Sequence, residues 1–173
     1  YTNYWLTLEN YPEAISTFEQ LLEIEELRED TRLRTLRSLG QLTAAEERWR
    51  DSIKYYELWR ESSLEEDDVV YRGLSYAHYQ VDELPEALPY WISYMELLLT
   101  NGEELGRDDY SYLNGLYFQL EDFENALPLT KTMIVLFDEQ TDWTNLSAVY
   151  ASLDDEERRV RSMNVAYLKG MLD

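Results

Sequence analysis

The residues from Asp109 to Asp138 constrain the fold of this chain more than any other stretch. Apolar and aromatic side chains recur there at helical spacings of three, four or seven residues, and the pattern is interrupted once, at Glu121 and Asp122. These side chains are Tyr110, Leu113, Tyr117, Leu120, Phe123, Ala126, Leu127, Met133, Ile134 and Leu136. The stretch therefore predicts a helix, a tight turn and a second helix.

The same pattern recurs along the whole chain. We aligned the copies on the small residue expected near the start of each second helix, which we call the anchor. The anchor positions are Ala14, Ser52, Ala87, Ala126 and Arg159. Their spacings are 38, 35, 39 and 33 residues. A regular spacing of this size is typical of a repeat protein built from helix pairs.

Three further columns agree with the anchors. Three residues before each anchor stand Tyr11, Trp49, Leu84, Phe123 and Glu156. Thirteen residues before it stand Leu39, Leu74, Leu113 and Leu146. Sixteen residues before it stand Leu36, Tyr71, Tyr110 and Trp143. Only the fifth copy departs, with Arg159 and Glu156 in place of a small and an aromatic residue, so we expect weaker packing there.

The order of an aromatic residue, a Leu three positions on, an aromatic four further, a turn and then Ala resembles the tetratricopeptide repeat, a helix pair of about 34 residues. The resemblance implies an all-α fold, a solenoid of antiparallel helix pairs that winds into a right-handed superhelix. We expect a single solenoid over residues 1–173, with units at about 1–26, 30–62, 67–100, 107–138 and 141–172. Because the chain opens on Tyr1 inside a predicted helix, we expect it to be a piece of a longer protein.

Composition narrows the possible functions. Hydrophobic residues make up 45% of the chain, which is ample for a core, and there is no run of eighteen apolar residues. The absence of cysteine excludes disulfides, zinc-thiolate sites and thiol catalysis. The net charge of −21 disfavours binding to nucleic acid and to anionic membranes, because both need basic side chains. The simplest interpretation of this charge is solubility through self-repulsion.

No catalytic arrangement is recognisable. The single histidine, His78, falls where the repeat places a packing aromatic, which favours a core histidine over a catalytic base. There is no Gly-rich phosphate loop, HExxH motif or nucleophile elbow. The acidic stretch 61–68 lacks the alternating ligands and central Gly of a calcium loop, so we interpret it as a connector. We therefore expect no enzyme activity, metal site or cofactor.

Function is then expected on a surface. In the tetratricopeptide family the concave face is lined mainly by the first helix of each unit, so the resemblance implies a partner-binding face there. The corresponding residues are Arg34, Arg37, Gln41, Arg72, Tyr76, Tyr79, Gln80, Ser111, Phe118, Gln119, Thr144 and Ala151. Most are polar or aromatic, which suits the recognition of a protein or peptide, with Tyr76, Tyr79 and Phe118 meeting the apolar side chains of the partner.

Residues 28–60 add a charge argument. They hold eight basic and six acidic side chains, a local balance of +2 that leaves −23 for the rest of the chain. The basic residues are Arg28, Arg32, Arg34, Arg37, Arg48, Arg50, Lys54 and Arg60. They either form an anion or carboxylate site or pair with acids on neighbouring turns, and the sequence favours neither interpretation. Family members that bind chaperone tails use Lys and Asn on this face, whereas Arg37, Gln41, Arg72 and Tyr76 stand here.

The fourth and fifth units also resemble bacterial repeat proteins encoded beside the TonB, ExbB and ExbD energy-transduction genes. The residues that carry this likeness are 110–123, Asp142, Trp143, Leu146, Tyr150, 153–156, Ala166, Tyr167, Gly170 and Leu172. The resemblance implies a periplasmic accessory of the complex that energises uptake of iron carriers. Two alternatives stay open: a co-chaperone or assembly adaptor that binds peptide tails, which allows a cytoplasmic location, or the regulatory domain of a larger enzyme.

Overall fold

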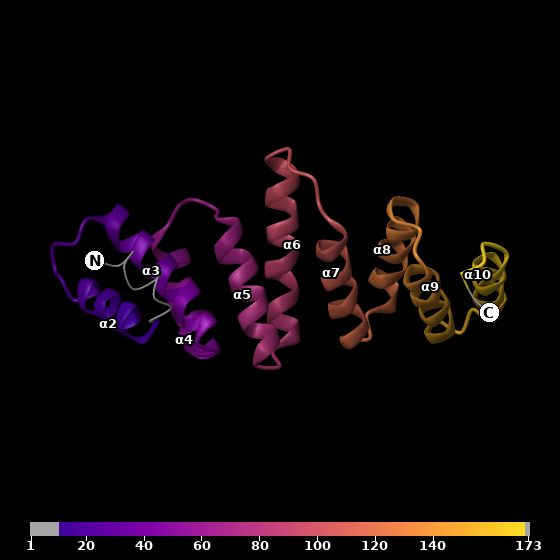
Figure 1. The fold of residues 1–173 in the computed structure, drawn as a ribbon, viewed down its shortest axis with the longest axis horizontal. Coiled ribbons are helices and arrows are strands. Elements are labelled where there is room, and N and C mark those ends of the chain that lie inside the picture. The colour runs from indigo at the N-terminus through magenta and orange to yellow at the C-terminus, as the bar shows by residue number, and fades with distance from the viewer. Residues whose placement is uncertain (1–10, 172–173) are drawn as a thin grey trace. The chain divides into compact units, whose positions relative to one another are not determined.

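The computed structural model describes residues 11–171, and these form nine α-helices and no strand (Figure 1). The helices are α2 (Tyr11–Leu22), α3 (Glu29–Ala45), α4 (Trp49–Ser62), α5 (Asp68–Gln80), α6 (Leu84–Thr100), α7 (Arg107–Gln119), α8 (Phe123–Leu136), α9 (Gln140–Ser152) and α10 (Glu156–Leu168). The predicted all-α class is confirmed. The helix and turn predicted before Tyr11 lie outside the described residues.

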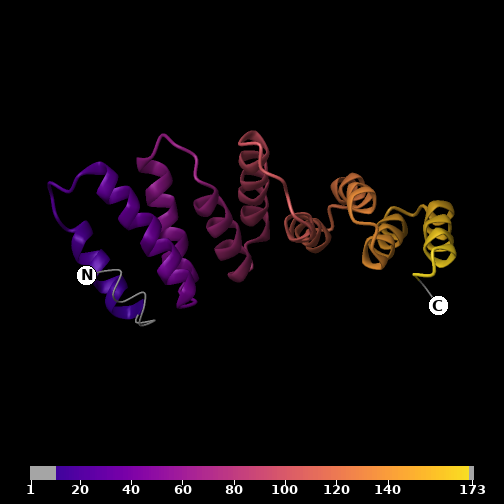
Figure 2. The same cartoon turned by 45° about the horizontal axis from the view of Figure 1, so that its top comes forward.

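The chain divides into two compact units, one ending at Glu103 and the other beginning at Glu104. In the first, α2 packs on α3, α3 on α4, α4 on α5 and α5 on α6, and α3 also contacts α5. In the second, α7 packs on α8, α8 on α9 and α9 on α10. Consecutive helices within each unit run in opposite directions (Figures 1 and 2). Sequential antiparallel pairs are therefore present as predicted, whereas one solenoid over the whole chain stays a prediction.

The turn inside each helix pair has the same backbone geometry. Glu47, Asp82, Glu121 and Asp154 have positive φ angles of 56°, 62°, 55° and 55°. The next residue donates its backbone N–H to a carbonyl five residues back, for example Arg48 N to Thr43 O at 2.8 Å. This arrangement satisfies the free carbonyls at the end of the first helix and reverses the chain within a few residues. The second helix then begins three residues before the anchor.

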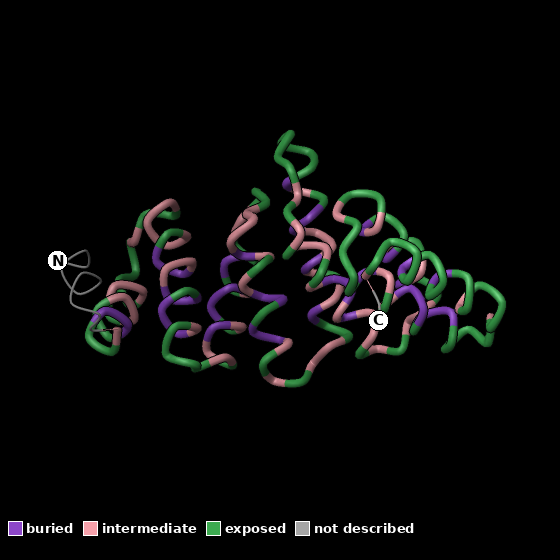
Figure 3. The backbone as a smooth tube through the Cα atoms, turned by 45° about the vertical axis from the view of Figure 1, so that its right-hand side comes forward, coloured by how far each residue is buried: buried purple, intermediate pink, exposed green. Residues whose placement is uncertain are grey.

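The anchors lie where two helices approach closely. Ala14, Ser52, Ala87 and Ala126 are 0% exposed. The Leu residues thirteen positions earlier, from Leu39 to Leu146, are also buried. Figure 3 shows buried positions recurring on successive turns of the helices, while the turns and connectors are exposed. The anchors of the first four pairs and the Leu column therefore form the core, while the residues three and sixteen positions before the anchors are mostly half-buried.

Tyr56 of α4 occupies a gap between two first helices of the first unit. Its buried ring lies against Gly40 of α3 on one edge and against Gly73 of α5 on the other. The hydroxyl of Ser52 also reaches α3, donating to the backbone carbonyl of Gly40 at 2.8 Å. Gly40 therefore marks a close approach, where an aromatic ring and a hydroxyl of α4 both reach α3.

Candidate interaction surface

The first unit carries seven of the predicted partner-binding residues, on helices α3 and α5. Arg34, Gln41, Arg72, Tyr76 and Gln80 are exposed, and Arg37 and Tyr79 are half-buried. Tyr76 is the most prominent apolar group among them, with 47% of its surface exposed. Because the packing columns occupy the opposite sides of these helices, the predicted residues are left for contact with solvent or a partner.

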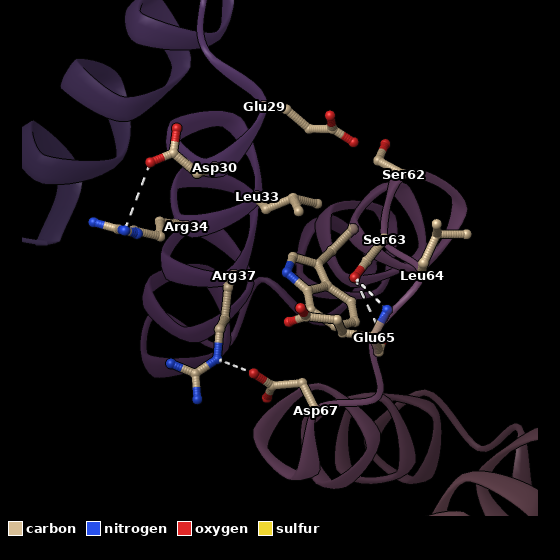
Figure 4. A pocket seen from close by; sticks show the side chains of 11 residues that line it. Glu29, Asp30, Leu33, Arg34, Arg37, Ser62, Ser63, Leu64, Glu65 and Asp67 are labelled. Atoms are coloured by element: carbon tan, nitrogen blue, oxygen red, sulfur yellow. Dashed lines mark hydrogen bonds and ion pairs between the residues drawn. The ribbon is translucent and has the colours of Figure 1, made fainter.

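The structure brings Arg34 and Arg37 to the rim of one cleft in this unit. The cleft has a volume of about 570 Å³ and lies between the first half of α3, the end of α4 and the connector 63–67. Its lining residues are Glu29, Asp30, Leu33, Arg34, Arg37, Trp59, Ser62, Ser63, Leu64, Glu65 and Asp67 (Figure 4). We call it the α3–α4 cleft. The other predicted residues of the unit do not line it.

Arg37 and Asp67 form one wall of the α3–α4 cleft. The guanidinium Nε of Arg37 lies 2.9 Å from Oδ2 of Asp67. Asp67 is also the N-cap of α5, where its Oδ1 accepts a hydrogen bond of 3.1 Å from the backbone N–H of Val70. One carboxylate therefore caps α5 and ties it to α3. The sequence predicts a connector at 61–68, but it gives no sign of the arginine that reaches Asp67.

Most of the basic residues in 28–60 pair with acids. Ion pairs join Arg28 and Arg34 to Asp30, Arg37 to Asp67, Arg48 to Asp51, Arg50 to Glu83 and Arg60 to Glu57, at 2.6 to 3.6 Å. Lys54 lies 5.2 Å from the centre of the Tyr55 ring. Of the two interpretations that the sequence left open, these contacts favour paired arginines over a free anion site.

Arg72 of α5 is partly committed to packing. Its guanidinium carbon lies 5.9 Å from the centre of the Tyr94 ring, which is buried on α6. A cation over an aromatic face is attracted by the electron density of the ring. Arg72 thus stabilises the packing of α5 on α6. The rest of its side chain is exposed on the same helix as Tyr76.

The second unit carries the remaining predicted residues, on α7 and α9. Ser111, Gln119 and Thr144 are exposed. Phe118 is half-buried, and its ring packs edge-to-face on Phe123 across the turn, with centroids 5.7 Å apart. Phe118 therefore contributes to the turn of the helix pair as well as to the surface. These residues do not gather around one cavity.

Thr144 and Ala151 do line a shared groove between α9 and α10. The groove has a volume of about 300 Å³, and its residues are Trp143, Thr144, Ser147, Ala148, Ala151, Arg159 and Met163. Arg159 occupies the anchor position and is only half-buried, unlike the fully buried anchors of the other pairs. It pairs with Glu156 at 2.5 Å, which lowers the pKa of that carboxyl. Arg159 lines this groove, but α9 and α10 pack on each other at least as extensively as α7 and α8 do, so weaker packing of the fifth unit is not confirmed.

A buried ion pair in the second unit escaped the sequence analysis. Arg107 at the start of α7 contacts both carboxylate oxygens of Asp142 on α9, at 3.0 and 2.8 Å. Asp142 is fully buried and also accepts the backbone N–H of Glu139 at 3.0 Å. The hydrogen bond to Asp142 raises the pKa of Arg107. The two residues lie 35 positions apart, so no local pattern in the sequence joins them.

His78 packs in the core of the first unit, as the sequence favoured. Its Nδ1 lies 2.8 Å from Glu83, and its ring stacks on Tyr90 with centroids 5.6 Å apart. Glu83 also contacts Arg50 at 2.6 Å, and the hydrogen bond from Arg50 lowers the pKa of Glu83 more than the one from His78 does. Through these contacts His78 links the end of α5 to the start of α6.

Two kinds of structural feature are absent from residues 11–171. This part of the chain contains no cluster of three or more histidine or carboxylate side chains placed to hold a metal ion. Within the same residues, none of the helices combines the length and apolar character needed to cross a membrane.

Comparison with solved structures identifies the fold. No family model matches the sequence, and no curated protein sequence is significantly similar to it. The crystal structure of MamA is similar over 97% of this chain and 87% of its own, with a TM-score of 0.71 and 16% identity. YrrB, a tetratricopeptide repeat protein with an unusual peptide-binding site, covers 94% of this chain and 79% of its own, with a TM-score of 0.72 and 13% identity. BtubC from P. vanneervenii covers 99% and 79%, with a TM-score of 0.63 and 16% identity.

These similarities show that the chain has the fold of tetratricopeptide repeat proteins. Their identities are too low to carry over a ligand or a partner, so they define a class of structure. Besides this fold, the chain has a net charge of −21 and the two hollows described above, the α3–α4 cleft and the groove at Arg159.

Proposed function

We propose that this chain is a non-catalytic scaffold that binds a segment of another protein on the exposed sides of its first helices. One observation carries the proposal. On α3, α5, α7 and α9 the residues expected at a binding face are exposed or half-exposed, while the Leu column of the same helices is buried. The peptide-binding site of YrrB, whose fold this chain shares, supports a peptide as the ligand. The proposal requires no cofactor, metal or nucleic acid.

Binding of this kind needs no conformational switch. The helices are already held by their cores, so only the partner segment loses conformational freedom. Tyr76 offers a rigid aromatic surface with a polar tip, and Gln80 lies one turn further along α5. An extended or helical segment would place an apolar side chain on Tyr76 and its backbone near the amide group.

A peptide-display selection against the whole chain tests the proposal. Selected peptides are expected to lose most of their affinity for the Tyr76→Glu variant, because a charge would replace the aromatic contact. Leu99→Glu is the matched control, since Leu99 is similarly exposed, at 56%, but belongs to the second helix α6. Peptides that bind Tyr76→Glu as tightly as the unchanged chain would refute binding through α5.

A narrower role rests on the resemblance of the fourth and fifth units to repeat proteins encoded with TonB, ExbB and ExbD. On that basis we propose a periplasmic accessory of an iron-carrier uptake system as the more specific function. Co-purification of the native protein with those components from the cell envelope is the expected result. Recovery with cytosolic proteins instead would favour the adaptor alternative, and a catalytic domain elsewhere in the full chain would favour the regulatory one.

The adaptor alternative makes its own prediction. A co-chaperone of this fold binds acidic peptide tails through cationic residues on its first helices, which here are Arg37 and Arg72. Titration of such a tail would then saturate in the micromolar range and be abolished by changing both residues to Glu. Arg37 is paired with Asp67, and Arg72 packs on Tyr94, so both guanidinium groups are less available to an acidic tail.

A further inference from the structure

The α3–α4 cleft of the first unit has an apolar side. Leu33 of α3 and Trp59 of α4 line it, and Leu64 of the connector stands beside them. Leu64 is fully exposed, whereas Trp59 is buried among its neighbours. A single exposed Leu is common on protein surfaces. An exposed Leu at the rim of a cleft with other apolar residues, however, marks an apolar surface whose burial by a partner is favourable.

The charges that face this cleft are acidic. Arg37 is engaged by Asp67 at 2.9 Å, and Arg34 pairs with Asp30 at 3.6 Å. Figure 4 shows Arg34 pointing away from Ser63, Leu64 and Glu65, while Glu29 extends towards Ser62. Within residues 11–171 no cation lies at ion-pair distance from Glu29 or Glu65. The two carboxylates are therefore available to a ligand, whereas each arginine already has a carboxylate partner.

We propose that the α3–α4 cleft binds a peptide segment in which Lys or Arg side chains flank a large apolar side chain. This inference goes beyond the proposed function, because the cleft is a second binding surface that Tyr76 does not line. The apolar side chain would cover Leu33, Trp59 and Leu64, while the flanking cations would meet Glu29 and Glu65. A volume of about 570 Å³ is enough for one large side chain and its neighbours.

The charge of the whole chain acts in the same direction. With a net charge of −21, the protein attracts basic segments from a distance and repels acidic ones. An acidic tail entering the cleft would compete with Asp67 for Arg37 and would meet Glu29 and Glu65 at short range. The cleft therefore selects against the acidic peptides that a cluster of free arginines would bind.

Three short fluorescein-labelled peptides test this inference by anisotropy titration against the whole chain. The first alternates Lys with Leu and Trp. The second replaces each Lys by Glu, and the third replaces Leu and Trp by Ser. The test variant is Glu29→Gln with Glu65→Gln, and a separate variant is Leu64→Ser. The matched control is Glu86→Gln with Glu96→Gln, which removes the same charge from exposed positions of α6 in the same unit.

The Lys, Leu and Trp peptide is expected to bind, and the other two to bind at least about tenfold more weakly. Its affinity should fall about tenfold for Glu29→Gln with Glu65→Gln and several-fold for Leu64→Ser, but less than about twofold for the α6 control. The inference is wrong if the acidic peptide binds as well, if the Ser peptide binds equally, or if the control weakens binding as much as the test variant.

The outcome is separable from that of the proposed function. Failure of the Lys, Leu and Trp peptide to bind, alongside display-selected peptides that depend on Tyr76, would leave the scaffold proposal intact and overturn the assignment of the cleft. Loss of binding with Tyr76→Glu is not expected for the basic peptide, because Tyr76 does not line the cleft.

Discussion

The Tyr56 ring between two glycines provides the sharpest test of the packing described here. A Cβ added at Gly40 would lie 2.5 Å from Cε1 and 2.6 Å from Cδ1 of Tyr56. A Cβ added at Gly73 would clash with Cε2, on the opposite edge, and would lie 2.6 Å from Cζ at the tip of the ring. Carbon atoms in favourable contact are about 3.5 to 4.0 Å apart, so the ring would have to move about 1 Å. Because both edges are occupied, it cannot move away from one glycine without approaching the other.

The expected magnitude follows from two opposing terms. Overpacking a tightly filled core costs about 1 to 3 kcal/mol, whereas replacing Gly by Ala inside a helix gains about 1 kcal/mol. We therefore expect Gly40→Ala and Gly73→Ala to lower the free energy of unfolding by up to about 2 kcal/mol each. Gly115→Ala on α7 has nothing within 4 Å of the added carbon, so it should raise stability by about 0.5 to 1 kcal/mol.

Urea unfolding followed by far-UV circular dichroism and by tryptophan fluorescence measures these differences. The two probes are needed because a repeat chain does not necessarily unfold in one step. In a Tyr56→Leu background the cost of Gly40→Ala should largely disappear, because the smaller side chain leaves room for the methyl group. The reasoning is refuted if Gly40→Ala raises the midpoint as Gly115→Ala does, or if its cost is unchanged in the Tyr56→Leu background.

Three further predictions concern stability. Arg107→Met should cost about 3 kcal/mol by thermal or urea unfolding, because it leaves the buried Asp142 unpaired, and adding Asp142→Leu should restore most of the loss. Trp91→Ala should cost about 3 to 5 kcal/mol through the cavity that it opens, and a cost below about 1 kcal/mol would contradict its core position. Burial raises the pKa of Tyr56 and of Tyr90 to about 12, from about 10 when unfolded. The folded state thus favours the neutral phenols. The urea midpoints should therefore be steady up to about pH 10 and fall between about pH 10 and 12. The Tyr56→Phe variant should show a smaller fall.

The helix pairs could be predicted because their packing columns are local. A small anchor, a Leu thirteen residues earlier and an aromatic at the turn are all visible within about 16 residues, and each is dictated by the close approach of two helices. The turn geometry was less visible. Glu47, Asp82, Glu121 and Asp154 adopt positive φ angles that glycine usually marks, and none of them is glycine. Their repeated position, two residues before each second helix, is a signal that appears only once the repeats are aligned.

Whether the charged residues form ion pairs could not be predicted from their spacing in the sequence. Arg37 meets Asp67 and Arg107 meets Asp142 across neighbouring first helices, about 30 residues apart in the sequence. Whether an arginine is free or paired depends on which carboxylate the stacking of helices brings to it. The local balance of +2 in residues 28–60 therefore described composition correctly but gave no information about the surface that these residues present.

The groove in the second unit lies where the sequence departs from its own repeat, beside Arg159, the one large anchor. The α3–α4 cleft is instead walled by the acidic connector 63–67, which joins two helix pairs and lies outside the packing columns. The packing columns must be alike in every unit because they fill the same space between helices, so they specify the fold and carry no information about a partner. A position that breaks a column, or that lies outside the columns, is not under that constraint, and its side chain can shape a surface. Both places coexist with well-formed helices, which makes them better guides to binding than the residues that match the family.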